Sequence, residues 1–485
     1  MKKIISLLLL VGIARGAGEW NPRDYGAQAD GRTLDTQAIQ SAIEACAKAG
    51  GGTVLLTNGV FLSGTLRLRS HVTLCVATGT ILRGSAAIKD YESITPQIEY
   101  LYRARFTKSL IFAERQEDIA LTGGGEIDGQ GKLFPAKKGD DGGRPYLVRF
   151  SECRNVRVSG LTLRDSARWL SHYLVCTNVA IQGVTIRSRI RENRDGMDLD
   201  SCNGVRIANC DIYTGDDSIV LKATAGIPCR NVAVTNCTLS STASALKLGT
   251  ESQGGFADVT FEGCTVYDTR DGVSVEEVDG GVCERVRVSG IQMRNVKVPI
   301  FVRLGNRANP LPGHPKPGVG RMRDVTITDV NATEAGSSGC SITGVLEQPV
   351  ENVTLKNIRI KFAGGGTAQD AARAVPEREA AYPKGEMFGT LPAYGFFVRH
   401  ATGIKLHDLD LSFAKDEARP ALVADDVRDL EVQNLRAQSG AAGALIRVGG
   451  AKTRGVVLRG SQLNTLKQSI LKSADLPADA VVVEP

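Results

Sequence analysis

The sequence predicts an all-β protein: a single-stranded right-handed parallel β-helix, or solenoid, with one short N-terminal helix. Three observations predict this fold. With 485 residues, the chain exceeds the size at which a single compact core stops growing, unless the fold is elongated and repetitive. Its 54 glycines and 5% aromatic residues are typical of a turn-rich structure rather than of a helical bundle. A short alternating motif recurs along most of its length.

The first 18 residues have the layout of a secretory signal peptide. Lys2 and Lys3 precede an apolar run over residues 4–13, and small residues at positions 14 and 16–18 offer a cleavage site. We expect residues 19–485 to form one mature domain that is exported to the periplasm or the extracellular space. No later stretch approaches the ~20 consecutive apolar residues that a membrane span requires.

One helix is expected near the start of the mature chain. The segment TQAIQSAIEACAKAGGG, residues 36–52, carries apolar residues at helical spacing and ends in glycines. Helical periodicity is nearly absent elsewhere. The remaining sequence should therefore form strands and turns.

A repeat governs most of the chain, with a constant spacing of 27 residues between Gly204 and Arg285. Each copy alternates apolar and polar residues around a small or polar turn, which predicts two short strands. One such unit cannot bury its own apolar face, so the copies must stack, with about 4.8 Å between successive coils. The copies begin at Asn155, Asn178, Gly204, Asn231, Asp258, Arg285, Asp324, Asn352, Gly403, Asp429 and Gly455.

The eleven cysteines fit this register. Disulfides are the usual expectation for an exported protein. Eight of the cysteines, however, fall into two columns of the repeat that elsewhere hold mostly apolar residues, which favours buried thiols that pack as small hydrophobic groups. Metal binding is less expected, because no Cys-x-x-Cys pair occurs. The two columns are Cys210, Cys237 and Cys264, and Cys153, Cys176, Cys202, Cys229 and Cys283.

A second alignment places acidic residues on one face of the solenoid. The segments DGMDLD, DSIVLK, SALKLG, DGVSVE and VPIFVR, which begin at residues 195, 217, 244, 271 and 298, align without gaps. Their third and fifth positions should point inward and their fourth and sixth positions toward solvent. Asp195 and Asp217 then become neighbours on adjacent coils, with Asp216 beside them. The cluster is bordered by Lys222, Lys247 and Arg303.

This cluster of carboxylates indicates acid and base chemistry. A single aspartate is explained equally well by the tight turns of a solenoid. Three that converge across two coils raise one another's pKa, an arrangement that is costly unless it is used. Cleavage of a glycosidic bond needs one protonated carboxylic acid and one ionised carboxylate that activates water or attacks. An open, elongated trough suits a polymer.

On these residues the chain resembles glycoside hydrolase family 28, the polygalacturonases and rhamnogalacturonases that cleave pectin. The resemblance implies that Asp216 is the general acid, that Asp195 and Asp217 hold and activate water, and that hydrolysis inverts the anomeric carbon without a metal or other cofactor. The substrate would be a pectic polysaccharide or oligosaccharide. The matching segments are DYGAQADGRTLDTQAIQSAIEAC from residue 24, GGGTV at 50–54, GEIDGQG at 125–131, NRDGMD at 193–198 and GDD at 215–217.

Two departures from the family pattern bear on the substrate. Residues 243–245 read Ala-Ser-Ala where the family has Gly-His-Gly, and residues 274–276 read Ser-Val-Glu where it has Arg-Ile-Lys, which would grip a galacturonate carboxylate. Glu276 would repel that carboxylate unless Arg303 neutralises it. An alternating rhamnose and galacturonate backbone, or a decorated pectin fragment, is therefore a candidate beside galacturonan. The expected substrate contacts are Asn193, Asp198, Lys222, Lys247, Glu276 and Arg303.

Some assignments stay open at this point. Lys222, Lys247 and Arg303 could equally be solvated residues of the solenoid surface. Trp169 could either stack on a sugar ring or belong to the core. Insertions at 306–322 and 363–400 expand two coils to 39 and 51 residues. Loops of this length are often functional. They favour exo action if they wall one end of the trough, and internal cleavage if they lie flat.

Two other functions share the predicted scaffold. A polysaccharide lyase would need a Ca²⁺ cluster or a strong base, for which Lys222 or Lys247 could serve. A non-catalytic carbohydrate-binding β-helix would need no acid at Asp216. The formal charge of +6 is only a weak indication of anionic partners. We expect a monomer without bound metal, nucleic-acid partner or membrane span.

Overall fold

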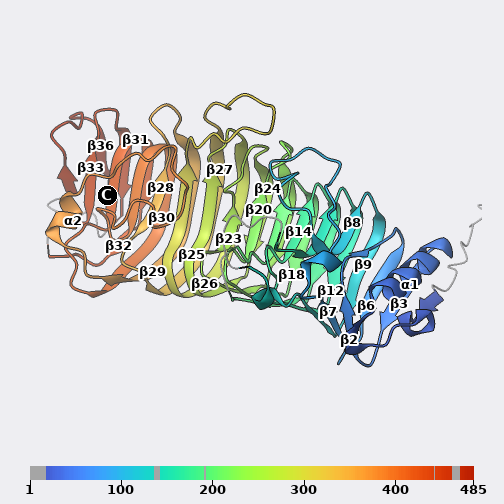
Figure 1. Cartoon of the computed structure of the whole chain (residues 1–485). Helices are drawn as coiled ribbons and strands as arrows, with labels where there is room; N and C mark the ends of the chain where they lie inside the picture. Colours follow the sequence, from blue (N-terminus) through green and yellow to red (C-terminus); the bar gives the residue numbers. More distant parts are fainter. Residues whose placement is uncertain (1–17, 136–142, 191–192, 442, 461–469, 485) are drawn as a thin grey trace, which may run out of the picture.

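The fold is a parallel β-helix, as the sequence predicts. The computed structural model describes residues 18–135, 143–190, 193–441, 443–460 and 470–484, so the predicted signal peptide lies almost wholly outside the described residues. Figure 1 shows strands stacked along one axis, with the N-terminal helix at one end and the C-terminal coils at the other. No helix in the part of the chain that the structure describes is long and apolar enough to cross a membrane.

Each coil contributes strands to three parallel sheets. The first sheet contains the first strand of each repeat: β1 (Gly18–Trp20), β3 (Gly52–Leu56), β6 (Val72–Val76), β9 (Glu117–Gly123), β12 (Arg154–Ser159), β15 (Thr177–Gln182), β18 (Asn203–Ala208), β21 (Cys229–Thr235), β24 (Phe256–Glu262), β34 (Arg454–Arg459) and β36 (Val481–Glu484). The second contains β2 (Asp30–Leu34), β4 (Val60–Ser63), β7 (Ile81–Gly84), β10 (Glu126–Asp128), β13 (Thr162–Arg164), β16 (Thr185–Ser188), β19 (Asp211–Thr214), β22 (Thr238–Ser241) and β32 (Arg436–Ala437).

The third sheet holds the segments that carry the aspartates. Its strands are β5 (Leu66–Arg67), β8 (Ser109–Glu114), β11 (Tyr146–Ser151), β14 (Ser171–Leu174), β17 (Met197–Asp200), β20 (Ile219–Lys222), β23 (Ser244–Leu248), β28 (Cys340–Thr343), β33 (Ile446–Gly449) and β35 (Ile470–Lys472). Six long strands bend from one sheet into another: β25 (Thr265–Glu277), β26 (Val282–Leu304), β27 (Arg321–Ala335), β29 (Val350–Gly364), β30 (Phe396–Lys415) and β31 (Leu422–Gln433).

The predicted register is confirmed residue by residue. Met197 pairs with Ile219, Ile219 with Leu246, and Leu246 with Val273 on successive coils of the third sheet. In the first sheet, Val205 pairs with Val232, as the constant spacing of 27 requires. The gapless alignment therefore places the expected residues above one another.

The copies begin where the backbone turns in the left-handed conformation. Asn178 has φ of 61° and Gly204 has φ of 76°. Only glycine adopts this conformation freely, and Asn and Asp tolerate it because their side chains hydrogen-bond locally. Here the Asn178 amide donates to Oδ1 of Asn155 on the preceding coil at 2.9 Å. The left-handed turn explains why most copies start with Asn, Asp or Gly, and the side-chain hydrogen bond between coils further favours Asn and Asp over Gly.

The predicted N-terminal helix forms but is shorter than expected. Helix α1 (Thr36–Lys48) ends before the glycines, which lead the chain into β3. Gly51 has φ of 106°, and a side chain there would meet the His71 carbonyl at 2.5 Å. The apolar face of α1, centred on Ile39 and Ile43, is buried against the end of the core. A further helix, α2 (Ala368–Ala372), and 3₁₀ turns η1 (Pro22–Tyr25), η2 (Ile88–Asp90) and η3 (Gly131–Leu133) were not predicted.

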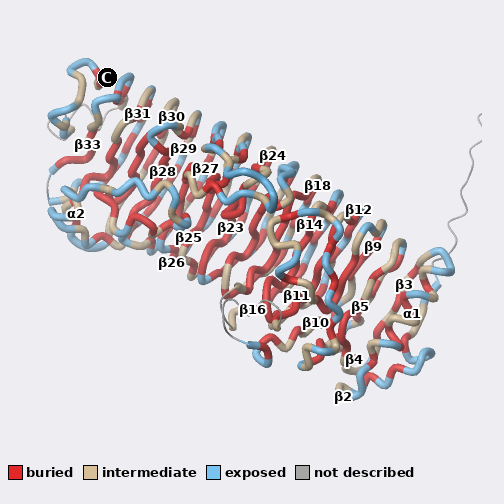
Figure 2. Tube along the Cα trace, turned by 45° about the horizontal axis from the view of Figure 1, so that its top comes forward, coloured by how far each residue is buried: buried red, intermediate tan, exposed pale blue. Residues whose placement is uncertain are grey.

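The cysteine columns line the interior as thiols. All eleven cysteines are free and ten of them are buried, so the expectation of packed thiols rather than disulfides is confirmed. In Figure 2 the strands are mostly buried along the whole axis, whereas exposed and half-buried segments cross above them or lie at the turns.

One expectation about the third sheet is wrong. The fourth and sixth positions of the aligned segments do not face solvent, because other parts of the chain cover them (Figure 2). The 91–107 connection and the 363–400 insertion supply this cover: Leu101 donates to the Thr224 carbonyl, and Gly385 to Asp271. The side chains buried in this way include Asp198, Val220, Lys247, Ser274 and Phe301 at the fourth position, and Asp200, Lys222, Glu276 and Arg303 at the sixth.

Candidate active site

A pocket of about 580 Å³ opens over the third sheet at the coils of β14 to β25. Three of the predicted site residues on its wall are the aspartates of the cluster, and three more are Asn193, Lys222 and Lys247. The described residues that line it are Tyr102, Arg105, Phe106, Arg144, Arg168, Trp169, Asn193, Asp195, Gly215, Asp216, Asp217, Lys222, Thr242, Ala243, Lys247, Glu251, Arg270, Tyr382 and Lys384.

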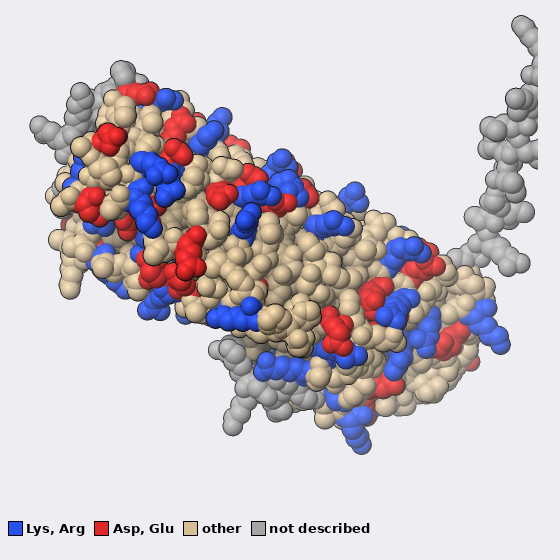
Figure 3. Space-filling model, turned by 90° about the horizontal axis from the view of Figure 1, so that it is seen from above, with Lys and Arg blue, Asp and Glu red and all other residues tan. Residues whose placement is uncertain are grey.

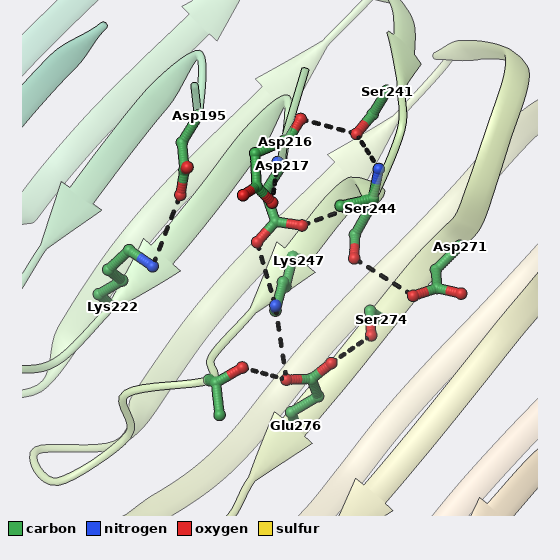
Figure 4. A network of polar contacts seen from close by, with 12 residues as sticks. Asp195, Asp216, Asp217, Lys222, Ser241, Ser244, Lys247, Asp271, Ser274 and Glu276 are labelled. Carbon is green, nitrogen blue, oxygen red and sulfur yellow. Dashed lines mark hydrogen bonds and ion pairs between the residues drawn. The ribbon is translucent and has the colours of Figure 1, made fainter. Parts of the chain in front are cut away.

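The structure brings Asp195, Asp216 and Asp217 together. Asp195 directly precedes the Gly196 that leads into β17, and the Asp216–Asp217 pair precedes β20 on the next coil. The Gly196 amide donates to the Asp217 carbonyl at 2.9 Å, which holds the two turns side by side. In Figure 4 the Asp216 and Asp217 carboxylates lie next to each other, and Asp195 extends from the neighbouring coil.

Asp216 is held by the backbone of both coils. Its Oδ2 accepts from the Asn193 amide and its Oδ1 from the Asp217 amide, each at 3.0 Å. These bonds favour the ionised form, but burial and the neighbouring charge of Asp217 outweigh them and raise the pKa of Asp216. Its protonated form is thereby favoured, as a proton donor requires.

Asp217 has the opposite tendency. Its Oδ2 accepts from Lys247 Nζ at 3.0 Å and its Oδ1 from the Ser244 amide at 2.9 Å. Burial alone would raise its pKa, but the positive charges of Lys247 and Lys222 outweigh burial and lower the pKa of Asp217. Two residues adjacent in the chain therefore favour different protonation states.

Lys222 lies among three carboxylates. Its Nζ is 3.2 Å from Glu251 Oε2, 3.6 Å from Asp198 Oδ1 and 3.8 Å from Asp195 Oδ2. Burial raises the pKa of Asp195 and of Asp198 well above the usual range, in spite of this cation. Glu251 is also buried, yet Lys222 and then Arg307 lower its pKa to about 2. Glu251 is thus the fixed counter-charge of Lys222.

Glu276 and Arg303 do not line the pocket. The Glu276 carboxylate accepts from Ser274 at 2.7 Å and from Thr250 at 3.0 Å, and lies 3.8 Å from Lys247. Burial raises its pKa to about 7. Arg303 donates instead to the Gly344 and Glu377 carbonyls, so among the described residues Lys247 rather than Arg303 is the cation beside Glu276. Figure 4 shows Lys247 between Asp217 and Glu276.

Asp198 and Trp169 are both buried, but only Trp169 lines the pocket. Asp198 is fully buried beneath the cluster, beside Lys222, and does not line the pocket. Trp169 belongs to an aromatic cluster with Phe106 and Tyr146 and also lines the pocket, with its ring 4.6 Å from Lys222 Nζ. Trp169 is therefore part of a buried cluster and also reaches the pocket wall, and its role as a sugar platform stays a prediction.

Sequence reasoning missed the residues that come from outside the repeat. Tyr102, Arg105 and Phe106 lie in the connection before β8, and Tyr382 and Lys384 in the 363–400 insertion. The segment YLYRARF at 100–106 was a usable signal, because three aromatic residues and two arginines cluster there outside any repeat copy.

The charged side chains of the wider surface are mixed in sign. Along the face seen from above in Figure 3, Lys and Arg stand beside Asp and Glu over the whole length. Within the described part of the chain, three side chains that could together bind a metal ion lie close to one another. They are His71, Glu117 and Asp118, and they do not line the pocket.

A family model and several relatives show the family to which the chain belongs. The model of glycosyl hydrolases family 28 matches residues 53–381. A probable polygalacturonase of Vitis vinifera is 30% identical over 366 residues, which cover 70% of this chain and 74% of that protein. An endo-polygalacturonase of Pectobacterium carotovorum subsp. carotovorum is 26% identical, covering 69% of this chain and 85% of the relative.

Solved structures support the same assignment. The exopolygalacturonase from Thermotoga maritima is 25% identical and superposes with a TM-score of 0.64 over 71% of this chain and 87% of its own. The polygalacturonase from Erwinia carotovora ssp. carotovora is also 25% identical, with a TM-score of 0.57 over 68% of this chain and 90% of its own. Both are right-handed parallel β-helices, like the one described here. The protein therefore belongs to glycosyl hydrolases family 28 and is a glycosidase of the polygalacturonase type.

Proposed function

We propose that this enzyme hydrolyses glycosidic bonds of a pectic polysaccharide or oligosaccharide with inversion at the anomeric carbon. Residues 1–18 would direct its export, and residues 19–485 would act as one domain in the periplasm or outside the cell. The observation that carries the proposal is the convergence of Asp195, Asp216 and Asp217 in one pocket, where the pKa is raised for Asp216 and lowered for Asp217.

The chemistry follows from these protonation states. Asp216 donates its proton to the glycosidic oxygen as the bond from that oxygen to the anomeric carbon breaks. Asp217, held ionised by Lys247, accepts a proton from the water whose oxygen forms the new bond to the same carbon. Asp195, on the adjacent coil, helps to hold that water. Proton exchange with solvent then restores an acidic Asp216 and an ionised Asp217.

The charges around the pocket suit an anionic sugar. Seven cationic side chains line it against four carboxylates, and the relatives include polygalacturonases of both endo and exo type. Galacturonan and rhamnogalacturonan both fit this description. The segments that carry Tyr102 and Tyr382 add walls to the pocket from outside the repeat. Exo action would follow if these walls close one end of the trough.

Elimination is less compatible with the site. A lyase that used Lys222 or Lys247 as its base would need that lysine to be neutral. Carboxylate partners raise the pKa of Lys222 and of Lys247 well above the usual range although burial opposes this, so both stay charged at neutral pH. Hydrolysis by the aspartates is therefore the better supported reaction.

The test is product analysis with homogalacturonan, rhamnogalacturonan and their oligomers. We expect saturated products that carry one added water by mass spectrometry. Asp216→Asn should lower turnover by about 10²- to 10⁴-fold, the usual contribution of a general acid. Asp416→Asn, at an exposed position outside the pocket, is the matched control and should retain activity. Unsaturated products that absorb ultraviolet light, or unchanged turnover of Asp216→Asn, would contradict the proposal.

A further inference from the structure

The third sheet offers few cations to a ligand on the C-terminal side of the aspartates. Ser274 and Glu276 stand where the family pattern has a cationic pair. The Glu276 carboxylate accepts hydrogen bonds from Ser274 and Thr250 and forms an ion pair with Lys247. Arg270 does line the pocket, but its guanidinium donates to Asp271 at 2.9 and 2.7 Å. An acidic sugar on this side needs another partner.

The 363–400 insertion reaches the pocket at this point. The Gly385 amide donates to Asp271 at 3.3 Å, and a side chain at Gly385 would approach the same carboxylate to 2.4 Å, so the close contact requires glycine. The contact sets Tyr382 and Lys384 on the pocket wall. The Tyr382 ring centroid lies 5.6 Å from Lys247 Nζ, and the residue remains 57% exposed.

Lys384 differs from the other two lysines of the pocket. Lys222 and Lys247 are buried and ion-paired with carboxylates. Lys384 is exposed, and within the described ranges of the chain no side chain forms an ion pair or hydrogen bond with its ammonium group. A charge that the fold does not neutralise is available to a ligand in the pocket.

We propose that Lys384 binds the carboxylate of a uronate residue on the C-terminal side of the aspartate cluster, with Tyr382 as the adjacent wall. The inference rests on the proposed function, since it assigns a subsite to the same pocket. It makes the insertion a determinant of substrate specificity, because an anionic sugar is bound there by side chains from outside the repeat.

The test measures binding apart from turnover. Titration calorimetry on the Asp216→Asn protein compares a galacturonate trimer with the same trimer as its methyl ester, which lacks the negative charges. Adding Lys384→Met should weaken binding of the acid trimer about ten-fold, the usual value of a hydrogen bond to a charged group. Binding of the ester should change less than two-fold, and Lys384→Arg should restore binding of the acid. The effect should shrink at high salt.

Lys405→Met is the matched control, since Lys405 is exposed on β30 outside the pocket, and it should leave both affinities unchanged. The inference is overturned if Lys384→Met weakens both ligands equally, if it changes neither, or if the acid trimer does not bind the parent protein. A different outcome separates the two proposals. If the acid trimer binds through Lys384 but the wild type releases no saturated products, the proposed function is contradicted and the Lys384 contact stands.

Discussion

Lys247 donates a hydrogen bond to Asp217, with 3.0 Å between Nζ and Oδ2, and both side chains are buried. Lys247 comes from the coil that follows Asp217, so the pair depends on the stacking of β20 and β23. The ion pair stabilises the ionised form of Asp217, whereas the pKa of the adjacent Asp216 is raised by burial and then by Asp217 itself. Groups with such separated pKa values can act as base and acid at the same pH.

Removing this cation should shift the acidic limb of the pH profile. In Lys247→Met, burial acts on Asp217 unopposed by its nearest cation, so the pKa of Asp217 rises. Because a base is inactive when protonated, the acidic limb of kcat/KM should move to higher pH by about one unit or more, where one unit corresponds to about 1.4 kcal/mol. Lys405→Met serves as control, and an acidic limb that stays in place would contradict the assigned role of Asp217.

Glu276 should influence the alkaline limb. Burial raises its pKa to about 7, so it gains a negative charge near Lys247 and Asp217 as the pH passes neutrality. That charge favours the protonated form of nearby acids such as Asp216. In Glu276→Gln the alkaline limb of kcat should therefore move to lower pH, by less than about one unit because the charge is indirect. A shift to higher pH would show that Glu276 acts in another way.

Stability should depend on pH through Glu277, which lies outside the pocket. Burial raises its pKa to about 8 from the usual value near 4.5, so the folded protein binds this proton more tightly than the unfolded chain. The stabilisation is present below about pH 4.5 and is lost as the pH rises toward 8, at about 1.4 kcal/mol per unit. Glu277→Gln should raise the melting temperature at pH 8 and leave it nearly unchanged at pH 5. A lower melting temperature at pH 8 would contradict this.

The cysteine columns make two further outcomes testable. Because all eleven thiols are free, a reducing agent should leave the melting temperature unchanged. Cys283→Ser places a hydroxyl in a fully buried position and should cost about 1–3 kcal/mol of the free energy of unfolding. The same change at the half-buried Cys75 should cost much less. A melting temperature that falls on reduction would indicate disulfides instead.

Much of this fold could be predicted from the sequence because the repeat encodes it locally. Alternating residues and a turn that needs the left-handed conformation recur at one spacing, and stacking follows from the need to bury each apolar face. The same register places Asp195 beside the Asp216–Asp217 pair. The meeting of the three aspartates was predictable because each belongs to the repeat.

The cover over the third sheet was not predictable in the same way. The burial of Lys247 and Arg303 depends on segments without periodicity, whose course over the sheet is set by contacts such as Gly385 to Asp271. Alternation tells which side of a strand faces away from the core, but not whether that side meets water. The expected end of the helix at residue 52 was wrong for a related reason. Glycines are common just after the last turn of a helix, so they mark its end without being part of it.

The central claim is that the three aspartates hydrolyse a glycosidic bond by direct attack of water. It is tested most directly by following the anomeric proton of the product by NMR during the first turnovers, before mutarotation. We predict that the product appears first with the anomeric configuration opposite to that of the cleaved linkage. A first product that keeps the configuration of the linkage, or an unsaturated one, would contradict the account.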